Sequence, residues 1–94
     1  MKHYILAKFK ENIDWKGLVP EITAHFDPAK AIDGVSGVII HPSCSDKANR
    51  FHIMIEMQLT PEGLKNWDHS AVHSEWKSKY GDMLEGKTIF DCEE

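Results

Sequence analysis

FHIMIEMQL, residues 51–59, is the clearest β-strand pattern in this chain. Side chains of a strand alternate between its two faces, so the odd positions from Phe51 to Leu59 form one apolar face. The even positions carry His52, Glu56 and Gln58, which favour a wetter environment. The pattern therefore predicts a strand in a sheet that is covered by the core on one side only.

Three further segments alternate or carry turn signals in a way that favours strands. Residues 2–10, KHYILAKFK, put His3 at the head of an apolar face that continues with Ile5, Ala7 and Phe9. The Asp33-Gly34 turn predicts the start of a second strand over 35–40. A last strand is predicted over 87–92, and a polar loop over 43–49 separates the two middle strands.

Two helical regions lie between these strands. Asp14 is a suitable N-cap for a helix with apolar residues at three- and four-residue spacing up to Phe26. Thr60-Pro61 is a cap followed by a first-turn proline, and it opens a second helix. We expect a break near His69, a new cap at Ser70, and an end at Gly81.

The predicted order is strand, helix, strand, strand, helix, strand. This order is typical of an α+β, ferredoxin-like fold, in which a four-stranded antiparallel sheet carries its helices on one face. The other face stays bare, and we expect Tyr4, Leu6, His52 and Met54 to lie on it. Two such faces packed together make an α/β barrel, so the sequence predicts a homodimer.

Composition excludes several classes of protein. The chain has 94 residues, a formal net charge of −4 and a single arginine, Arg50, which argues against a nucleic-acid partner. Its length predicts one domain, residues 1–94. The N-terminal segment does not fit a signal peptide, and Cys44 and Cys92 match no zinc or disulfide spacing, so we expect a cytoplasmic protein with no membrane partner.

Several segments, in this order, resemble the stress-responsive dimeric α/β-barrel (Dabb) family. They are HYILAKFK at 3–10, the turn at 33–35, the polar loop before Phe51, the segment from Leu64 to Trp67 leading to His73, and Ile89-Phe90-Asp91. The resemblance implies a Dabb domain over 1–94 and a homodimer joined through its sheets. It also implies a small-molecule pocket between sheet and helices, with an undefined reaction.

The enzymatic relatives that this resemblance implies are polyketide cyclases of the olivetolic acid cyclase type, which use no metal or cofactor. Their two pocket histidines match His3 and His73, which become the candidate catalytic residues, with His73 as general base. Trp67 stands where they have a tyrosine, and an indole N–H can only donate a hydrogen bond. Ile53 stands where they have a histidine in the third strand.

The candidate substrate-binding residues are Trp67, Ile53, Trp76 and Tyr80, because small-molecule pockets are mostly apolar. The same aromatic residues fit a hydrophobic core at helical spacing. His69 and His73 are four residues apart, which puts two imidazoles on one helical face, but the glutamate of an HExxH motif is absent. We therefore predict no metal and no cofactor.

Three functions stay open at this point. The first is a stress-response protein that binds a small apolar or carbonyl-containing ligand. The second is a cofactor-independent, cyclase-like enzyme that uses His73 as base and His3 as its partner. The third is a structural dimer whose interior is filled and binds no ligand.

Overall fold

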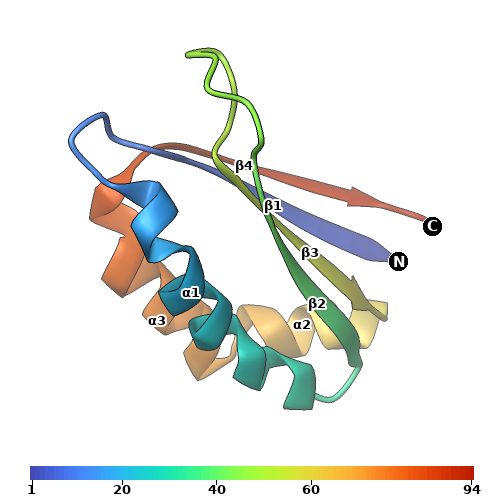
Figure 1. Cartoon of the computed structure of the whole chain (residues 1–94). Helices are drawn as coiled ribbons and strands as arrows, with labels where there is room; N and C mark the ends of the chain where they lie inside the picture. Colours follow the sequence, from blue (N-terminus) through green and yellow to red (C-terminus); the bar gives the residue numbers. More distant parts are fainter.

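The computed structural model describes all 94 residues as a four-stranded antiparallel sheet with helices on one face (Figure 1). The strand order is β2-β3-β1-β4. The strands are β1 (Lys2–Phe9), β2 (Val35–Pro42), β3 (Ile53–Leu59) and β4 (Leu84–Cys92). The helices are α1 (Trp15–Phe26), α2 (Pro61–Asp68) and α3 (Ala71–Tyr80), with short 3-10 turns at Asp27–Ala31 and Gly81–Met83. The predicted ferredoxin-like α+β fold is confirmed.

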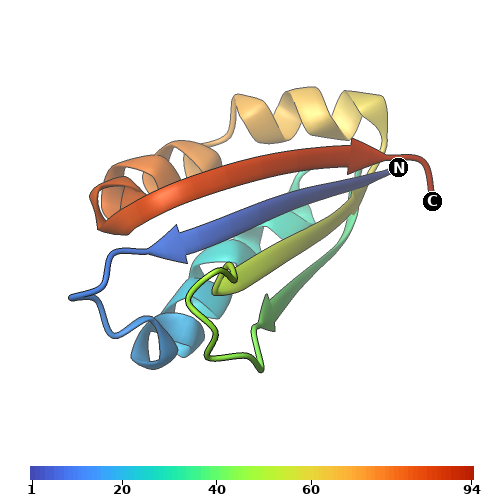
Figure 2. The same cartoon turned by 90° about the horizontal axis from the view of Figure 1, so that it is seen from above.

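The helices are unevenly distributed behind the sheet. Figure 2 looks onto the face without helices and shows α2 and α3 along the β4 edge, with α1 on the side of β3 and β2. The loop after β2 extends beyond the end of the sheet, and the two chain termini lie together at the opposite end (Figure 1). No helix has the length and apolar content needed to cross a membrane.

The predicted helix caps are all present. The Asp14 side chain accepts from Gly17 N at 3.3 Å, and the Thr60 hydroxyl accepts from Gly63 N at 3.0 Å. Ser70 ends one helix and begins the next, because its Oγ donates to the Trp67 carbonyl at 2.8 Å and accepts from His73 N at 3.1 Å. A side chain that satisfies free backbone groups at such a junction stabilises two short helices instead of one long helix.

The core lies between the helices and one face of β1 and β3. The odd positions of β3 from Ile53 to Leu59 are buried, as their alternation predicts. Phe26 packs against Trp67 and Trp76 with ring centroids 5.6 and 5.1 Å apart. These aromatic rings supply much of the apolar area that a chain of this length buries.

The Asp33-Gly34 turn contacts the first turn of α2 closely. Gly34 has a φ of +90°, and a Cβ there would lie 2.5 Å from the Cα of Gly63. A Cβ on Gly63 would lie 2.3 Å from the Gly34 carbonyl oxygen, which accepts from Thr60 N at 2.9 Å. Only glycine fits both positions, since an added Cβ would overlap backbone atoms of the other segment.

Three predicted strand boundaries differ from the structure. β3 begins at Ile53, so Phe51 lies outside the strand and its side chain is exposed. β2 continues through Pro42, and β4 begins three residues early, at Leu84. Pro42 is tolerated because β2 is an edge strand, where a missing N–H removes no ladder bond.

His52 does not lie on the bare face of the sheet, which corrects the prediction from alternation. Its ring stacks on Trp15 with centroids 4.9 Å apart and rings within 10° of parallel. Its Nδ1 accepts a hydrogen bond from Phe9 N at 3.0 Å. Because His52 precedes β3, the strand's alternation does not set its direction, and stacking and this hydrogen bond place it at the end of the sheet instead.

The face of the sheet without helices, called the open face below, carries apolar side chains around a polar centre. Tyr4 and Leu6 are half-buried on it, and Ile39 and Phe90 are 48% and 58% exposed. The remaining half-buried apolar residue on it is Met54.

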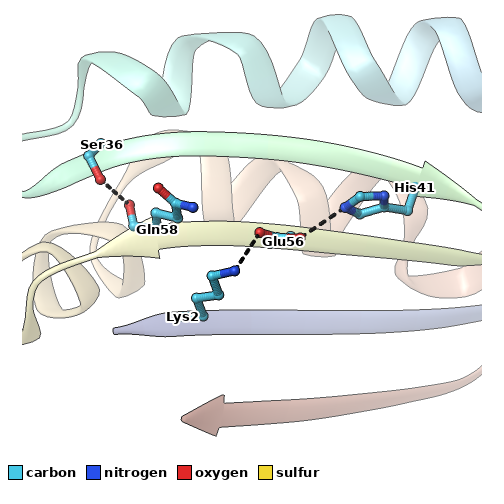
Figure 3. Close-up of polar contacts among 5 residues, drawn as sticks. All are labelled: Lys2, Ser36, His41, Glu56 and Gln58. Atoms are coloured by element: carbon cyan, nitrogen blue, oxygen red, sulfur yellow. Dashed lines mark hydrogen bonds and ion pairs between the residues drawn. The ribbon is translucent and has the colours of Figure 1, made fainter. Parts of the chain in front are cut away.

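Figure 3 shows that Glu56, at the centre of the open face, contacts both His41 and Lys2. Its carboxylate accepts from His41 Nε2 at 3.0 Å and pairs with Lys2 Nζ at 3.3 Å. The hydrogen bond from His41 and the neighbouring Lys2 hold the pKa of Glu56 below its usual range. The charged groups at the centre of the open face are therefore paired with one another.

Candidate functional site

A pocket of about 310 Å³ lies between the helix-covered side of β1 and β4 and helices α2 and α3. His3 and His73, the two candidate catalytic residues, both line it, although 70 positions separate them in the sequence. Its size is at the lower end of ligand pockets, which measure about 300–1,000 Å³. The polar and aromatic residues that line it are His3, Asp68, His73, Trp76, Lys87 and Asp91.

His3 is held by a carboxylate on the neighbouring strand. The register of β1 and β4 sets His3 opposite Asp91, and Nδ1 lies 2.5 Å from Asp91 Oδ1. An ionised carboxylate only accepts, so the proton of the neutral imidazole belongs on Nδ1. Nε2 then keeps its lone pair. His3 itself is 5% exposed, and this bond offsets part of the cost of burying a polar ring.

His73 is held in the same way by a backbone group. Its Nδ1 lies 3.1 Å from the Asp68 carbonyl oxygen, which can only accept, so this ring too carries its proton on Nδ1. The ring packs over Trp67 with centroids 4.9 Å apart. Nε2 of His73 therefore also stays a hydrogen-bond acceptor.

This arrangement is suited to moving protons. In its neutral form each imidazole, with Nδ1 bonded and Nε2 free, can take a proton from an acidic C–H or O–H group of a bound molecule. Lys87 also lines the pocket, and a lysine ammonium group can stabilise negative charge that develops on an oxygen. Orientation of each ring by a fixed acceptor is the usual requirement for such a base.

The four candidate substrate-binding residues occupy two kinds of position. All four are at most 1% exposed and belong to the core, and of them only Trp76 lines this pocket, whereas Ile53 lines a second hollow at the end of the open face. Trp67 Nε1 is buried without a hydrogen-bond partner. Tyr80 donates to Glu21 at 2.6 Å, and burial together with this bond raises the pKa of Tyr80 well above its usual range.

The helix break separates the two histidines of the HxxxH spacing. His69 is the C-cap of α2, whereas His73 lies in the first turn of α3, so the two do not share one continuous helical face. No group of three or more His, Cys, Asp or Glu side chains is arranged to hold a metal ion.

Three polar residues of the pocket were not expected from the sequence: Asp91, Asp68 and Lys87. A signal for Asp91 was present, because in the predicted strand order the end of the last strand pairs with the head of the first. Lys87 lies four residues before Asp91 and shares its face of the strand. Asp68 contributes a backbone carbonyl, for which a side-chain pattern gives no signal.

Comparison with known proteins adds to the evidence on the fold. No protein-family model matches the sequence, and no curated protein sequence is significantly similar to it. Solved structures do match. A dimeric ferredoxin-like protein of unknown function from Jannaschia sp. CCS1 has a TM-score of 0.80 at 15% identity, over 99% of this chain and 97% of that one.

Two further solved structures are similar over nearly the whole chain. A Dabb family protein with a ferredoxin-like fold from Mesorhizobium loti has a TM-score of 0.74 at 14% identity, covering 99% of this chain and 94% of that one. A hydroxynitrile lyase from Passiflora edulis has a TM-score of 0.73 at 15% identity, covering 95% and 87%. At these identities the similarity defines the class of the protein by fold alone, and that class is ferredoxin-like α+β.

Proposed function

We propose that this chain is a homodimeric, stress-responsive protein of the Dabb type that binds a small molecule in the pocket shared by His3 and His73. The observation that carries the proposal is the convergence of two imidazoles, each with its Nδ1 bonded and its Nε2 free, on one pocket of about 310 Å³. A structural histidine needs only one partner and no pocket. Cavities with a few polar groups on apolar walls are the usual form of ligand sites.

The open face supports the homodimer. It is a sheet face without helices, and its exposed Ile39 and Phe90 gain apolar contacts only when another surface covers them. A second copy offers the same apolar residues around the same paired Glu56. Solved structures of similar fold are described as dimeric, which agrees with this assignment.

A second candidate is a cofactor-independent, polyketide cyclase-like enzyme that acts on a carbonyl compound. Nε2 of His73 takes a proton from the carbon next to the carbonyl, and the electron pair passes to the enolate oxygen. Lys87 is the group available to stabilise that oxygen, whereas Nε2 of His3, which carries a lone pair, can only accept a proton or a hydrogen bond. Trp67 cannot exchange a proton as a tyrosine does, and its buried Nε1 does not line the pocket.

Binding is tested by two-dimensional NMR of the ¹⁵N-labelled imidazoles during titration with a set of small ketones and β-diketones. Saturable shifts of both His3 and His73 support the binding function. Substitution His73→Ala abolishes the response at an unchanged fold, whereas His69→Ala, at the end of α2, serves as the matched control. If no compound shifts either ring, the structural dimer becomes the better account.

The enzymatic candidate needs a separate measurement. Exchange of the acidic C–H of a bound β-diketone for deuterium is followed by NMR in heavy water. Faster exchange with the wild-type protein, lost in His73→Ala, supports general-base catalysis. Binding without faster exchange retains the binding function and rejects the enzyme. We further propose a cytoplasmic location, in keeping with two cysteines that form no disulfide.

A further inference from the structure

A second hollow, separate from the His3 and His73 pocket, lies where the loop after β2 meets the end of the open face. It measures about 350 Å³. Its apolar wall is formed by Leu6, Phe51, Ile53 and Met54, and Arg50 and His52 also line it. This volume falls within the range of small-molecule sites.

The hollow has no carboxylate, although the chain carries a net charge of −4. The two adjoining hollows that also contain His52 are lined by Asp46 in one case and by Glu11 and Glu85 in the other. The pocket of His3 contains two aspartates. An anion entering the Arg50 hollow therefore meets no negative side chain in its wall.

Arg50 is the only arginine of the chain, and its guanidinium group has no carboxylate partner. Its side-chain hydrogen bond is from Nη1 to Asn49 Oδ1, at 2.6 Å. The remaining N–H groups are free to donate. A guanidinium group matches a carboxylate in geometry, since two parallel N–H groups can bind both oxygens at once.

His52 also lines the hollow, and its ring is held in a fixed, uncharged form. Its Nδ1 accepts from Phe9 N at 3.0 Å, so the proton is on Nε2. A charged ring would bring an N–H on Nδ1 against the Phe9 N–H, and burial together with Lys8 lowers the pKa of His52, so the ring stays neutral. His41 also lines the hollow, but its Nε2 is engaged by Glu56.

We propose that the Arg50 hollow binds a small organic carboxylate, with the carboxylate on the free N–H groups of Arg50 and its apolar body against Leu6, Phe51 and Met54. This site does not depend on the function proposed for the His3 and His73 pocket. Leu6 and Met54 also belong to the open face, so in a sheet-to-sheet dimer the apolar end of the ligand lies next to the interface.

The test is isothermal titration calorimetry of the full-length protein with sodium benzoate, with neutral benzamide as comparison. We expect one benzoate per protomer at about 1 mM or tighter, and no saturable binding of benzamide. Arg50→Gln weakens benzoate binding at least about tenfold, because a charge-assisted hydrogen bond is lost. Lys47→Gln removes the same charge from the same loop, outside the hollow, and leaves binding unchanged.

Each alternative outcome overturns the proposal in a distinct way. Equal losses in Arg50→Gln and Lys47→Gln mean that benzoate responds only to the general charge of the loop. Loss in His73→Ala with retention in Arg50→Gln assigns the anion to the pocket of the proposed function instead. Absence of binding to a protein whose size by light scattering is that of the folded dimer means that the hollow is not a site. Benzoate binding that survives His73→Ala and fails in Arg50→Gln supports it.

Discussion

Nδ1 of His3 lies 2.5 Å from the carboxylate of Asp91, across the pairing of β1 with β4. The first strand and the last strand of the chain thus meet in one hydrogen bond at the pocket. This bond determines which ring nitrogen of His3 can act on a ligand. His3 was expected from the sequence, but the position of its proton depends on Asp91, which lies 88 positions away.

Substitution Asp91→Ala tests this dependence directly. The buried His3 ring loses its acceptor, so we expect its proton no longer to stay mainly on Nδ1. We also expect the free energy of unfolding to fall by about 1–3 kcal/mol. Two-bond ¹H–¹⁵N correlation spectra report the proton position, and urea denaturation reports the stability. Glu93→Ala, two residues further on, is the control. An unchanged His3 spectrum in Asp91→Ala contradicts the assignment.

Substitution Gly63→Ala tests the contact between the turn before β2 and α2. The new Cβ would lie 2.3 Å from the Gly34 carbonyl oxygen, so the two segments must separate. We expect a loss of at least about 1–3 kcal/mol, measured by thermal or urea denaturation. Gly81→Ala, where nothing lies within 4 Å of the new atom, should cost little. Similar stability of the two variants would show that the contact tolerates a side chain.

The folded protein is expected to lose stability on acidification through His52. Burial and the nearby charge of Lys8 lower the pKa of His52, while Glu85 opposes them weakly. Below a pH of about 6.5, the ordinary pKa of histidine, His52 therefore binds a proton in the unfolded chain but not yet in the folded chain. The contribution of His52 to the free energy of unfolding is therefore fully present above about pH 6.5. It is lost as the pH falls towards the lowered pKa of His52 in the folded state.

Urea denaturation between pH 5 and pH 8 measures the effect. His52→Gln keeps an acceptor at this position and removes the titrating group, so its stability should vary less with pH than that of the wild type. His69→Gln, at the exposed end of α2, should follow the wild-type curve. Parallel curves for the wild type and His52→Gln would reject a role for this ring.

Substitution Leu6→Asp tests the open face as a dimer surface. In the proposed dimer a carboxylate at this position would be buried against the second copy, and burial of an unpaired charge is strongly unfavourable. Light scattering at micromolar concentration should give the mass of a monomer for Leu6→Asp and of a dimer for the wild type. Ala71→Asp, at the start of α3 on the helix side, should stay dimeric. A wild-type monomer contradicts the dimer outright.

The sequence was sufficient for most of the fold because local signals agreed with the global pattern. Asp14, Thr60 and Ser70 all cap helices as their residue types predict, and the odd positions of β3 are buried. Besides the shifted ends of β2 and β4, the errors concern Phe51 and His52. Both extend the alternation of β3 in sequence, but the strand begins after them, where loop contacts decide direction.

The site was predictable only in its histidines. His3 stood out because it heads an otherwise apolar strand face, and His73 was singled out by the resemblance to the Dabb family. Their partners required long-range information. The place of Asp91 beside His3 follows from the strand order. The contact between the Asp68 carbonyl and His73 depends on how α2 and α3 are joined, and a pattern of side chains gives no information on that.

The junction at Ser70 has a consequence for the phase of the helical repeat. In one continuous helix, residues six positions apart differ by about 240° in direction, which puts Trp67 and His73 on different sides of the axis. Their rings nevertheless lie 4.9 Å apart. The break between α2 and α3 changes the direction of the side chains that follow it. Trp67 and His73 can therefore be neighbours, although in one continuous helix they would point to different sides. An insertion or deletion of a single residue between Asp68 and Ala71, outside both helices, would therefore change the direction of His73 relative to Trp67.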